Sequence, residues 1–169
     1  MARALGYRSL LVPLADNAET ERALDVACQL AVEHGASLTA LAVVEVTPLL
    51  PLDARMEAEE AAAKRLLARA QAAGDSYGLA VAARTKRARQ AGEAIVAAAE
   101  ACRCDVIVIG SPRRRGSHVF GATTDVVLRR APCRVMVVAA PAKVVQLPSA
   151  AVWAGVSSSP RSAALRSSR

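Results

Sequence analysis

Residues 105–110 read DVIVIG, and this short run is the clearest structural feature of the sequence. The four residues between Asp105 and Gly110 are all apolar and β-branched. A run of this length and composition, bounded by turn residues, is typical of a central strand that is covered on both faces. Strands of this kind belong to parallel sheets flanked by helices, so the segment predicts an α/β fold.

Working outward from this segment, strand and helix patterns alternate along the chain. The predicted strands are residues 9–14, 37–46, 79–85, 105–109 and 134–139, and the predicted helices are residues 18–34, 53–73, 91–102 and 123–130. The run at 79–85 is the most polar of the strands, as expected near a sheet edge. We therefore expect an open, five-stranded, mostly parallel sheet with helices on both faces.

Several helix ends are predicted from single residues. Asp16 or Asn17 can cap the first helix, because short polar side chains accept hydrogen bonds from free amides at a helix start. Gly35 and Gly74 are expected to end the first and second helices, since glycine readily adopts the left-handed conformation that follows a helix.

The composition predicts one α/β domain, residues 1–141, followed by a disordered tail, residues 142–169. The tail is rich in Ser and Ala and holds four of the 22 lysines and arginines but no acid. Residues 1–141 therefore carry 18 bases against 15 acids, a mild excess. With one Phe, one Trp and two Tyr in the whole chain, a stacking platform for nucleic-acid bases is not expected.

Membrane, secreted and metal-binding classes are also disfavoured. The chain has no apolar run of about 18 residues and no secretory signal, so we expect a cytoplasmic protein without a membrane segment. The spacing of Cys28, Cys102, Cys104 and Cys133 fits neither a disulfide framework nor a zinc or C-x-x-C redox site. Reduced thiols packed as small hydrophobic side chains are expected, and no metal is assigned.

The turn after residues 105–109 has the features of an anion site. Gly110 follows the strand directly, Gly121 precedes a helix, and the first turn of that helix holds Thr123 and Thr124. Free amides at a helix start attract phosphate, and glycine permits close approach. The alternative assigns Gly110 to a tight turn and Thr123 or Thr124 to a helix cap. Neither a Walker loop nor a G-x-G-x-x-G fingerprint is present.

The order and spacing of these elements resemble the universal stress protein family. The resemblance covers about residues 8–139 and is carried by three segments: SLLVPLADNAETERALDVACQLAVEHGASLTALAVVEV (residues 9–46), DVIVIGSPRRRG (105–116) and FGATTDVVLRRAPCRVMVV (120–138). It implies a five-stranded α/β domain, often a homodimer formed through the last strand, which here begins with Arg134 and ends with Ala139.

Many members of this family bind ATP, and the resemblance implies which residues would do so here. Gly110 matches the first glycine of the family's phosphate loop and Gly121 matches the last. Thr124 matches a later hydroxyl at the helix start, with Thr123 before it. The positions that line the adenosine pocket in ATP-binding members correspond to Pro13, Val43 and Ile109.

The sequence also departs from the family pattern, so its phosphate loop is degenerate. Ala15 stands where ATP-binding members have an acid, and Asp16 is displaced by one position. The middle glycine of the loop is Arg113, Gly121 is followed by Ala122, and the loop is two residues shorter than the family pattern. Arg113 is expected to replace a lost main-chain contact through a charge-assisted hydrogen bond to phosphate.

Three functions are compatible with these features. The first is a regulatory stress-response module that binds ATP or a related adenine nucleotide without efficient turnover. The second is a dimeric interaction module that does not depend on nucleotide, because residues 110–138 also resemble universal stress domains attached to amino-acid transporters. The third is an ATP-hydrolysing enzyme, which is least favoured since no general base can be named near the loop.

Overall fold

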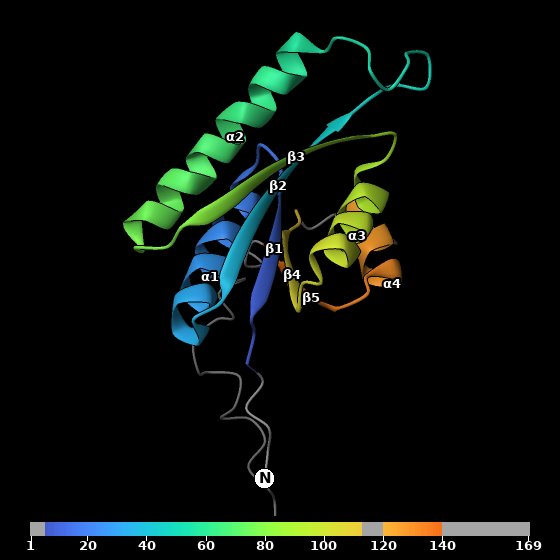
Figure 1. Ribbon diagram of the computed structural model, residues 1–169. Coiled ribbons are helices and arrows are strands. Elements are labelled where there is room, and N and C mark those ends of the chain that lie inside the picture. The colour runs from blue at the N-terminus through green and yellow to red at the C-terminus, as the bar shows by residue number, and fades with distance from the viewer. Residues whose placement is uncertain (1–5, 113–119, 140–169) are drawn as a thin grey trace, which may run out of the picture.

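The computed structural model describes residues 6–112 and 120–139, which form nine alternating elements (Figure 1). The strands are β1 (Ser9–Leu14), β2 (Ser37–Glu45), β3 (Val81–Ala88), β4 (Val106–Gly110) and β5 (Arg134–Val138). The helices are α1 (Ala18–His34), α2 (Glu57–Ser76), α3 (Ala91–Cys102) and α4 (Ala122–Arg130). Arg113 and the tail from residue 142 onward lie outside the described residues, so their predicted roles are not addressed by the structure.

The five strands form one parallel sheet in the order β3-β2-β1-β4-β5. This confirms the predicted α/β fold and places the polar third strand at a sheet edge. The chain moves from β1 outward to β3 and then returns to the other side of β1 with β4. The order of the strands therefore reverses between β1 and β4, where ligands of open α/β sheets usually bind.

Helices cover both faces of the sheet, with α1 and α2 on one side and α3 and α4 on the other (Figure 1). Consecutive strand residues face opposite layers: Leu10 and Val12 pack with α1 and α2, whereas Leu11 packs with α3 and α4. The apolar run at 105–110 follows the same alternation, since Val106 and Val108 face the first layer and Ile107 faces the second. Burial on both faces explains why this strand has no polar positions.

The ends of α1 agree with the sequence prediction. The Asn17 side chain, rather than that of Asp16, caps the helix and accepts a hydrogen bond from the Thr20 amide at 2.8 Å. Gly35 ends the helix in the left-handed conformation, with φ of 61°.

The predicted bounds of the second helix were wrong at both ends, because α2 covers Glu57–Ser76 instead of residues 53–73. Before the helix, the Arg87 side chain donates to the carbonyl oxygens of Leu52 and Ala54 and holds this segment as a loop. At the other end, Gly74 lies inside the helix. A Cβ atom there would meet the Val81 side chain and lie 2.7 Å from the carbonyl oxygen of Leu79, so close packing requires glycine.

The left-handed residue after α2 is Gly78, with φ of 66°. The Leu79 amide bonds back to the Gly74 carbonyl oxygen at 2.9 Å, so the chain is still part of the turn at the point where the strand was predicted to begin. The third strand therefore starts later than predicted, at Val81, and continues to Ala88, which pairs with Glu45 of β2. In the part of the chain that the structure describes, no helix is both long and apolar enough to cross a membrane.

Candidate functional site

A cavity of about 470 Å³ lies at the carboxyl ends of the strands, where the strand order reverses. Residues at the ends of β1 and β4 form its floor, and the first turns of α1, α3 and α4 reach its walls. Its size is in the range of ordinary small-molecule sites. The predicted location of a ligand site, beyond the carboxyl ends of the strands, therefore coincides with a real cavity.

The cavity brings together seven of the eight predicted site residues. Its lining includes Pro13, Val43, Ile109, Gly110, Gly121, Thr123 and Thr124. The eighth, Arg113, belongs to the segment outside the described residues. These seven residues come from three strands and from the start of α4, so the fold gathers positions that are more than 100 residues apart in sequence.

The start of α4 opens into this cavity. Gly121 is the N-cap residue in an extended conformation, and none of the side chains in residues 6–112 and 120–139 caps the helix. The first helical hydrogen bond joins the Asp125 amide to the Gly121 carbonyl oxygen at 3.0 Å, so the amides of Ala122, Thr123 and Thr124 precede the helical pattern. Neither threonine is a cap residue, which excludes that part of the alternative interpretation. Uncapped amides and the helix dipole together favour an anion at this point.

The two other helices that begin at the cavity are capped. Asn17 caps α1, as described above. At the start of α3, the Ala91 amide donates to the Glu45 carboxylate at 2.7 Å, so a side chain from β2 caps this helix. Glu45 lines the cavity but was not predicted as a site residue. Only the pairing of β2 with β3 brings Glu45 beside Ala91, and no local sequence motif indicates that contact.

Gly110 is required by close packing and not by an unusual turn. It is the last residue of β4, and the glycines with positive φ in the described residues are Gly35 and Gly78. A Cβ atom at Gly110 would meet the carbonyl of Glu19 and lie 2.5 Å from the Thr20 nitrogen. The glycine therefore lets the first turn of α1 approach the end of β4, and the tight-turn interpretation of Gly110 was wrong.

Thr124 is engaged in a buried side-chain hydrogen bond. Its hydroxyl donates to the Ser111 hydroxyl at 3.0 Å, and the two side chains are 4% and 1% exposed. The bond joins the residue after β4 to the first turn of α4 and fixes the helix start relative to the strand. Ser111 was missed in the sequence because its role depends on a partner 13 residues away.

Strand β2 extends beyond β1 at the cavity. The last paired residue of β1 is Leu14, opposite Ala42, whereas β2 continues to Glu45. The Val46 amide bonds to Ala88 on the β3 side. Because main-chain groups of successive strand residues point to opposite sides, the carbonyl of Val43 and the amide and carbonyl of Glu45 face the β1 side, past its last paired residue. These groups offer hydrogen-bonding positions to a ligand.

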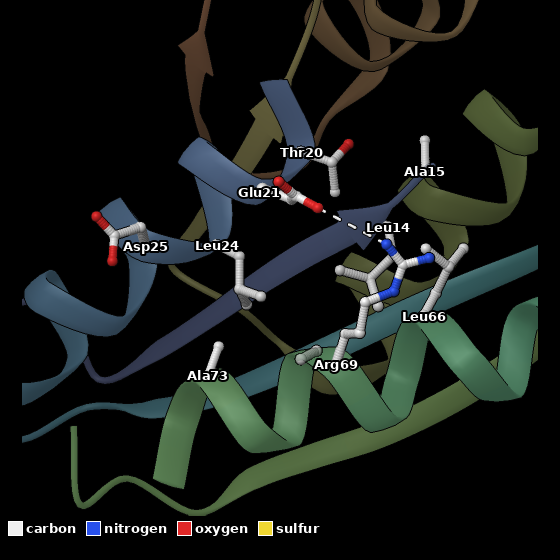
Figure 2. A pocket seen from close by; sticks show the side chains of 10 residues that line it. Leu14, Ala15, Thr20, Glu21, Leu24, Asp25, Leu66, Arg69 and Ala73 are labelled. Atoms are coloured by element: carbon white, nitrogen blue, oxygen red, sulfur yellow. Dashed lines mark ion pairs between the residues drawn. The ribbon is translucent and has the colours of Figure 1, made fainter. Parts of the chain in front are cut away.

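A second cavity of about 240 Å³ adjoins the first, between α1 and α2 (Figure 2). Leu14, Ala15, Thr20 and Leu66 line both cavities. Arg69 of α2 reaches across the second cavity toward Glu21 of α1, as the figure shows, and its other nitrogen lies 3.0 Å from Asp16. Asp16 is thus paired with Arg69 and does not line the first cavity, so it does not take the place of the acid missing at Ala15.

The fold and the cavity together define an α/β protein with a cavity at the switch point of a parallel sheet. The family model described as "Universal stress protein family" matches residues 6–139. The chain belongs to the universal stress protein family. None of the curated proteins matches it.

Solved structures of the same family share the fold. A universal stress protein from Burkholderia pseudomallei is 27% identical with a TM-score of 0.66, over 82% of this chain and 100% of that one. One from Archaeoglobus fulgidus, in complex with dAMP, is 22% identical with a TM-score of 0.59, over 79% and 99%. One from Arabidopsis thaliana, with AMP bound, is 19% identical with a TM-score of 0.60, over 80% and 93%.

Proposed function

We propose that this protein binds ATP or a related adenine nucleotide in the 470 Å³ cavity and acts as a regulatory module in the stress response, without efficient turnover. The observation that carries the proposal is the start of α4, which faces the cavity and has no side-chain cap from the part of the chain that the structure describes. Amides at such a helix start suit phosphate oxygens. Gly121 removes the side chain that would otherwise compete for them.

The two capped helices support a phosphate position at α4. Glu45 already satisfies the start of α3 and places a negative charge there, and Asn17 satisfies the start of α1. Phosphates are therefore directed to α4, beside Gly110 and Gly121, with Arg113 completing the phosphate contacts. The base and ribose would lie against Pro13, Val43 and Ile109, where the free main-chain groups of β2 offer a donor and acceptors.

The dAMP and AMP complexes of two structural relatives support an adenine nucleotide over other anions. Both relatives share the sheet and helix arrangement over most of their length, and the cavity lies at the switch point of that shared sheet. For turnover, no residue is assigned as a base or metal ligand, so binding is the proposed activity.

Isothermal titration calorimetry tests the proposal with three ligands. We expect saturable binding of ATP. Adenosine should bind more weakly because it lacks phosphates, and GTP should bind more weakly because its base differs. Equal binding of ATP and GTP would contradict an adenine site, and equal binding of ATP and adenosine would contradict a phosphate site at α4.

We also propose that the protein forms a homodimer through residues 134–139, the segment that contains β5. Within residues 6–112 and 120–139, strand β5 lies at the sheet edge and pairs with β4 alone, so its other edge can pair with a second copy. The Arg134 amide and the Val138 carbonyl bond toward β4, which leaves the amides of Val135 and Val137 facing outward.

Val137→Pro removes one outward amide without affecting the bonds to β4. Analytical ultracentrifugation should show a dimer for the original chain and a monomer for the variant. A dimer that gives no heat with any nucleotide would favour the alternative function, a nucleotide-independent interaction module that regulates a separate partner such as a transporter.

A further inference from the structure

Two cysteines lie side by side at the amino ends of the strands, whereas the cavity lies at their carboxyl ends. The Sγ atoms of Cys104 and Cys133 are 3.4 Å apart. Cys104 immediately precedes the segment that leads into β4, and Cys133 immediately precedes β5, so both stand at the amino ends of neighbouring strands. Both side chains belong to the apolar layer between the sheet and helices α3 and α4.

The main chain around this pair is held in place by hydrogen bonds. The Cys104 amide bonds to the Ala99 carbonyl oxygen at the end of α3, at 3.2 Å. The Asp105 amide bonds to Ser9 at 2.8 Å, and the Arg134 amide bonds to Asp105 at 3.3 Å. The two sulfur atoms are therefore neighbours because of fixed backbone positions. They need to approach by only about 1.4 Å to reach the length of a disulfide bond, about 2.05 Å.

The two thiols differ in their access to solvent. Cys104 is 6% exposed, whereas Cys133 is only partly buried. Burial raises the pKa of both thiols above the ordinary value of 9.0, so few thiolates exist at neutral pH. A reagent in solution reaches Cys133 first, and Cys104 is positioned to react with whatever forms there.

We propose that Cys104 and Cys133 form a modification site that a low-molecular-weight disulfide converts into an intramolecular disulfide. The Cys133 thiolate attacks one sulfur of the reagent, forms a mixed disulfide and releases one small thiolate. The Cys104 thiolate then attacks the Cys133 sulfur, forms the intramolecular bond and releases the second small thiolate. The protein loses two protons and two electrons, and the reagent takes them up and is reduced to two thiols.

The new bond would close a covalent loop from residue 104 to residue 133. This loop contains all of β4, the segment between Gly110 and Gly121, and all of α4, so it includes the residues assigned to phosphate. A loop of this length restricts the unfolded chain and should raise Tm by about 5–10 °C. Nucleotide affinity should stay within about twofold of that of the reduced protein, because the bond lies at the amino ends of the strands and the cavity lies at their carboxyl ends.

Peptide mapping of the full chain tests the proposal, since trypsin places Cys102, Cys104 and Cys133 on separate peptides. Cleavage after Arg103 separates Cys102 from Cys104, and cleavage after Arg130 and Arg134 isolates Cys133. The reduced protein is treated with oxidised glutathione at about pH 8.5, where a larger fraction of each thiol is deprotonated than at neutral pH. We expect one cross-link, between the Cys104 and Cys133 peptides, and no retained glutathione on either.

Serine variants establish the order of attack. Cys104→Ser should retain one glutathione on Cys133, because the resolving thiol is gone, whereas Cys133→Ser should leave Cys104 unmodified. Cys28→Ser is the matched control for a buried cysteine elsewhere and should still form the cross-link.

Three outcomes would overturn the proposal. The first is a cross-link that joins Cys102 to Cys104, the second is one that joins the Cys133 residues of two chains, and the third is the absence of any cross-link. Because the map of the original chain gives these answers directly, the test does not depend on the folding of a variant.

Discussion

Helices α3 and α4 both begin at the 470 Å³ cavity, but the amides of their first turns differ in whether a side chain accepts their hydrogen bonds. The first amide of α3 bonds to the Glu45 carboxylate, which comes from another element of the fold. Helix α4 begins at a glycine and has no side-chain cap among the described residues. A helix start with its own carboxylate repels an anion, and one without a cap attracts it. The difference shows that a helix start can be assigned as an anion site only when side chains from other elements are considered together with its own residues.

The largest expected effect concerns Gly110, at the end of β4 and in the lining of the cavity. Gly110→Ala places a methyl group against the main chain of Glu19 and Thr20, which has no flexible end to move aside. We expect a loss of about 3 kcal/mol in the free energy of unfolding, and weaker nucleotide binding, since overpacking displaces backbone. Urea denaturation measures the first effect and calorimetry the second.

Gly35→Ala is the control for Gly110→Ala. No atom lies within 4 Å of its added Cβ, so only the positive φ opposes the substitution, at a cost of about 1 kcal/mol. Equal losses for the two variants would show that conformational freedom, and not close packing, explains Gly110.

The next variant makes the start of α4 resemble that of α3. Gly121→Asp supplies a carboxylate cap at a residue whose extended conformation already suits an N-cap. The helix should gain a few tenths of a kcal/mol. ATP affinity should fall on the order of 100-fold, because a negative charge then occupies the phosphate position.

Gly121→Asn caps the same amides without a charge, so calorimetry should show a loss of only about tenfold. If the aspartate and asparagine variants bind ATP as the original protein does, the phosphates do not lie at α4.

The reverse change removes the cap of α3. Glu45→Ala should lower the free energy of unfolding by about 1 kcal/mol, because the Ala91 amide loses its acceptor. Glu45→Gln keeps an oxygen acceptor and should lose less than half of that amount. Thermal unfolding of the three proteins measures the difference, and an alanine variant as stable as the original would mean that water replaces the cap at no cost.

The smallest expected effect concerns Ala15, the position where the family resemblance implies an acid. Ala15→Asp places a carboxylate at the end of β1, on the boundary of both cavities, where it can accept a hydrogen bond from a ribose hydroxyl. ATP affinity should rise about threefold, the value of a modest hydrogen bond. Ala15→Asn is the neutral control, and tighter binding of 2′,3′-dideoxy-ATP by the aspartate variant would contradict a ribose contact.

Much of the fold could be predicted from the sequence because its elements are locally coded. Residues 18–34 and 91–102 matched α1 and α3 because polar or glycine residues stand at their ends, and residues 9–14 matched β1. The α2 bounds could not be predicted, since Arg87 holds the preceding loop and Val81 packs on Gly74. Each contact joins α2, or the loop before it, to a residue of β3, so neither is encoded within the helix itself.

The candidate site divides in the same way. Pro13, Val43 and Ile109 could be proposed from the sequence because strand ends of a parallel sheet gather at one edge. The pairing of Thr124 with Ser111, the capping of α3 by Glu45 and the engagement of Asp16 by Arg69 could not. Each depends on the relative placement of two side chains, which no spacing rule supplies.

By itself, the sequence determined the alternation of strands and helices, the parallel sheet and the placement of glycines at the end of β4 and at the start of α4. These features follow from hydrophobic periodicity and from the backbone preferences of single residues, which act locally. The tertiary structure alone decided that α4 is the helix left uncapped at the cavity and that Cys104 meets Cys133. Such contacts arise only when the packed sheet brings distant main-chain segments to fixed positions.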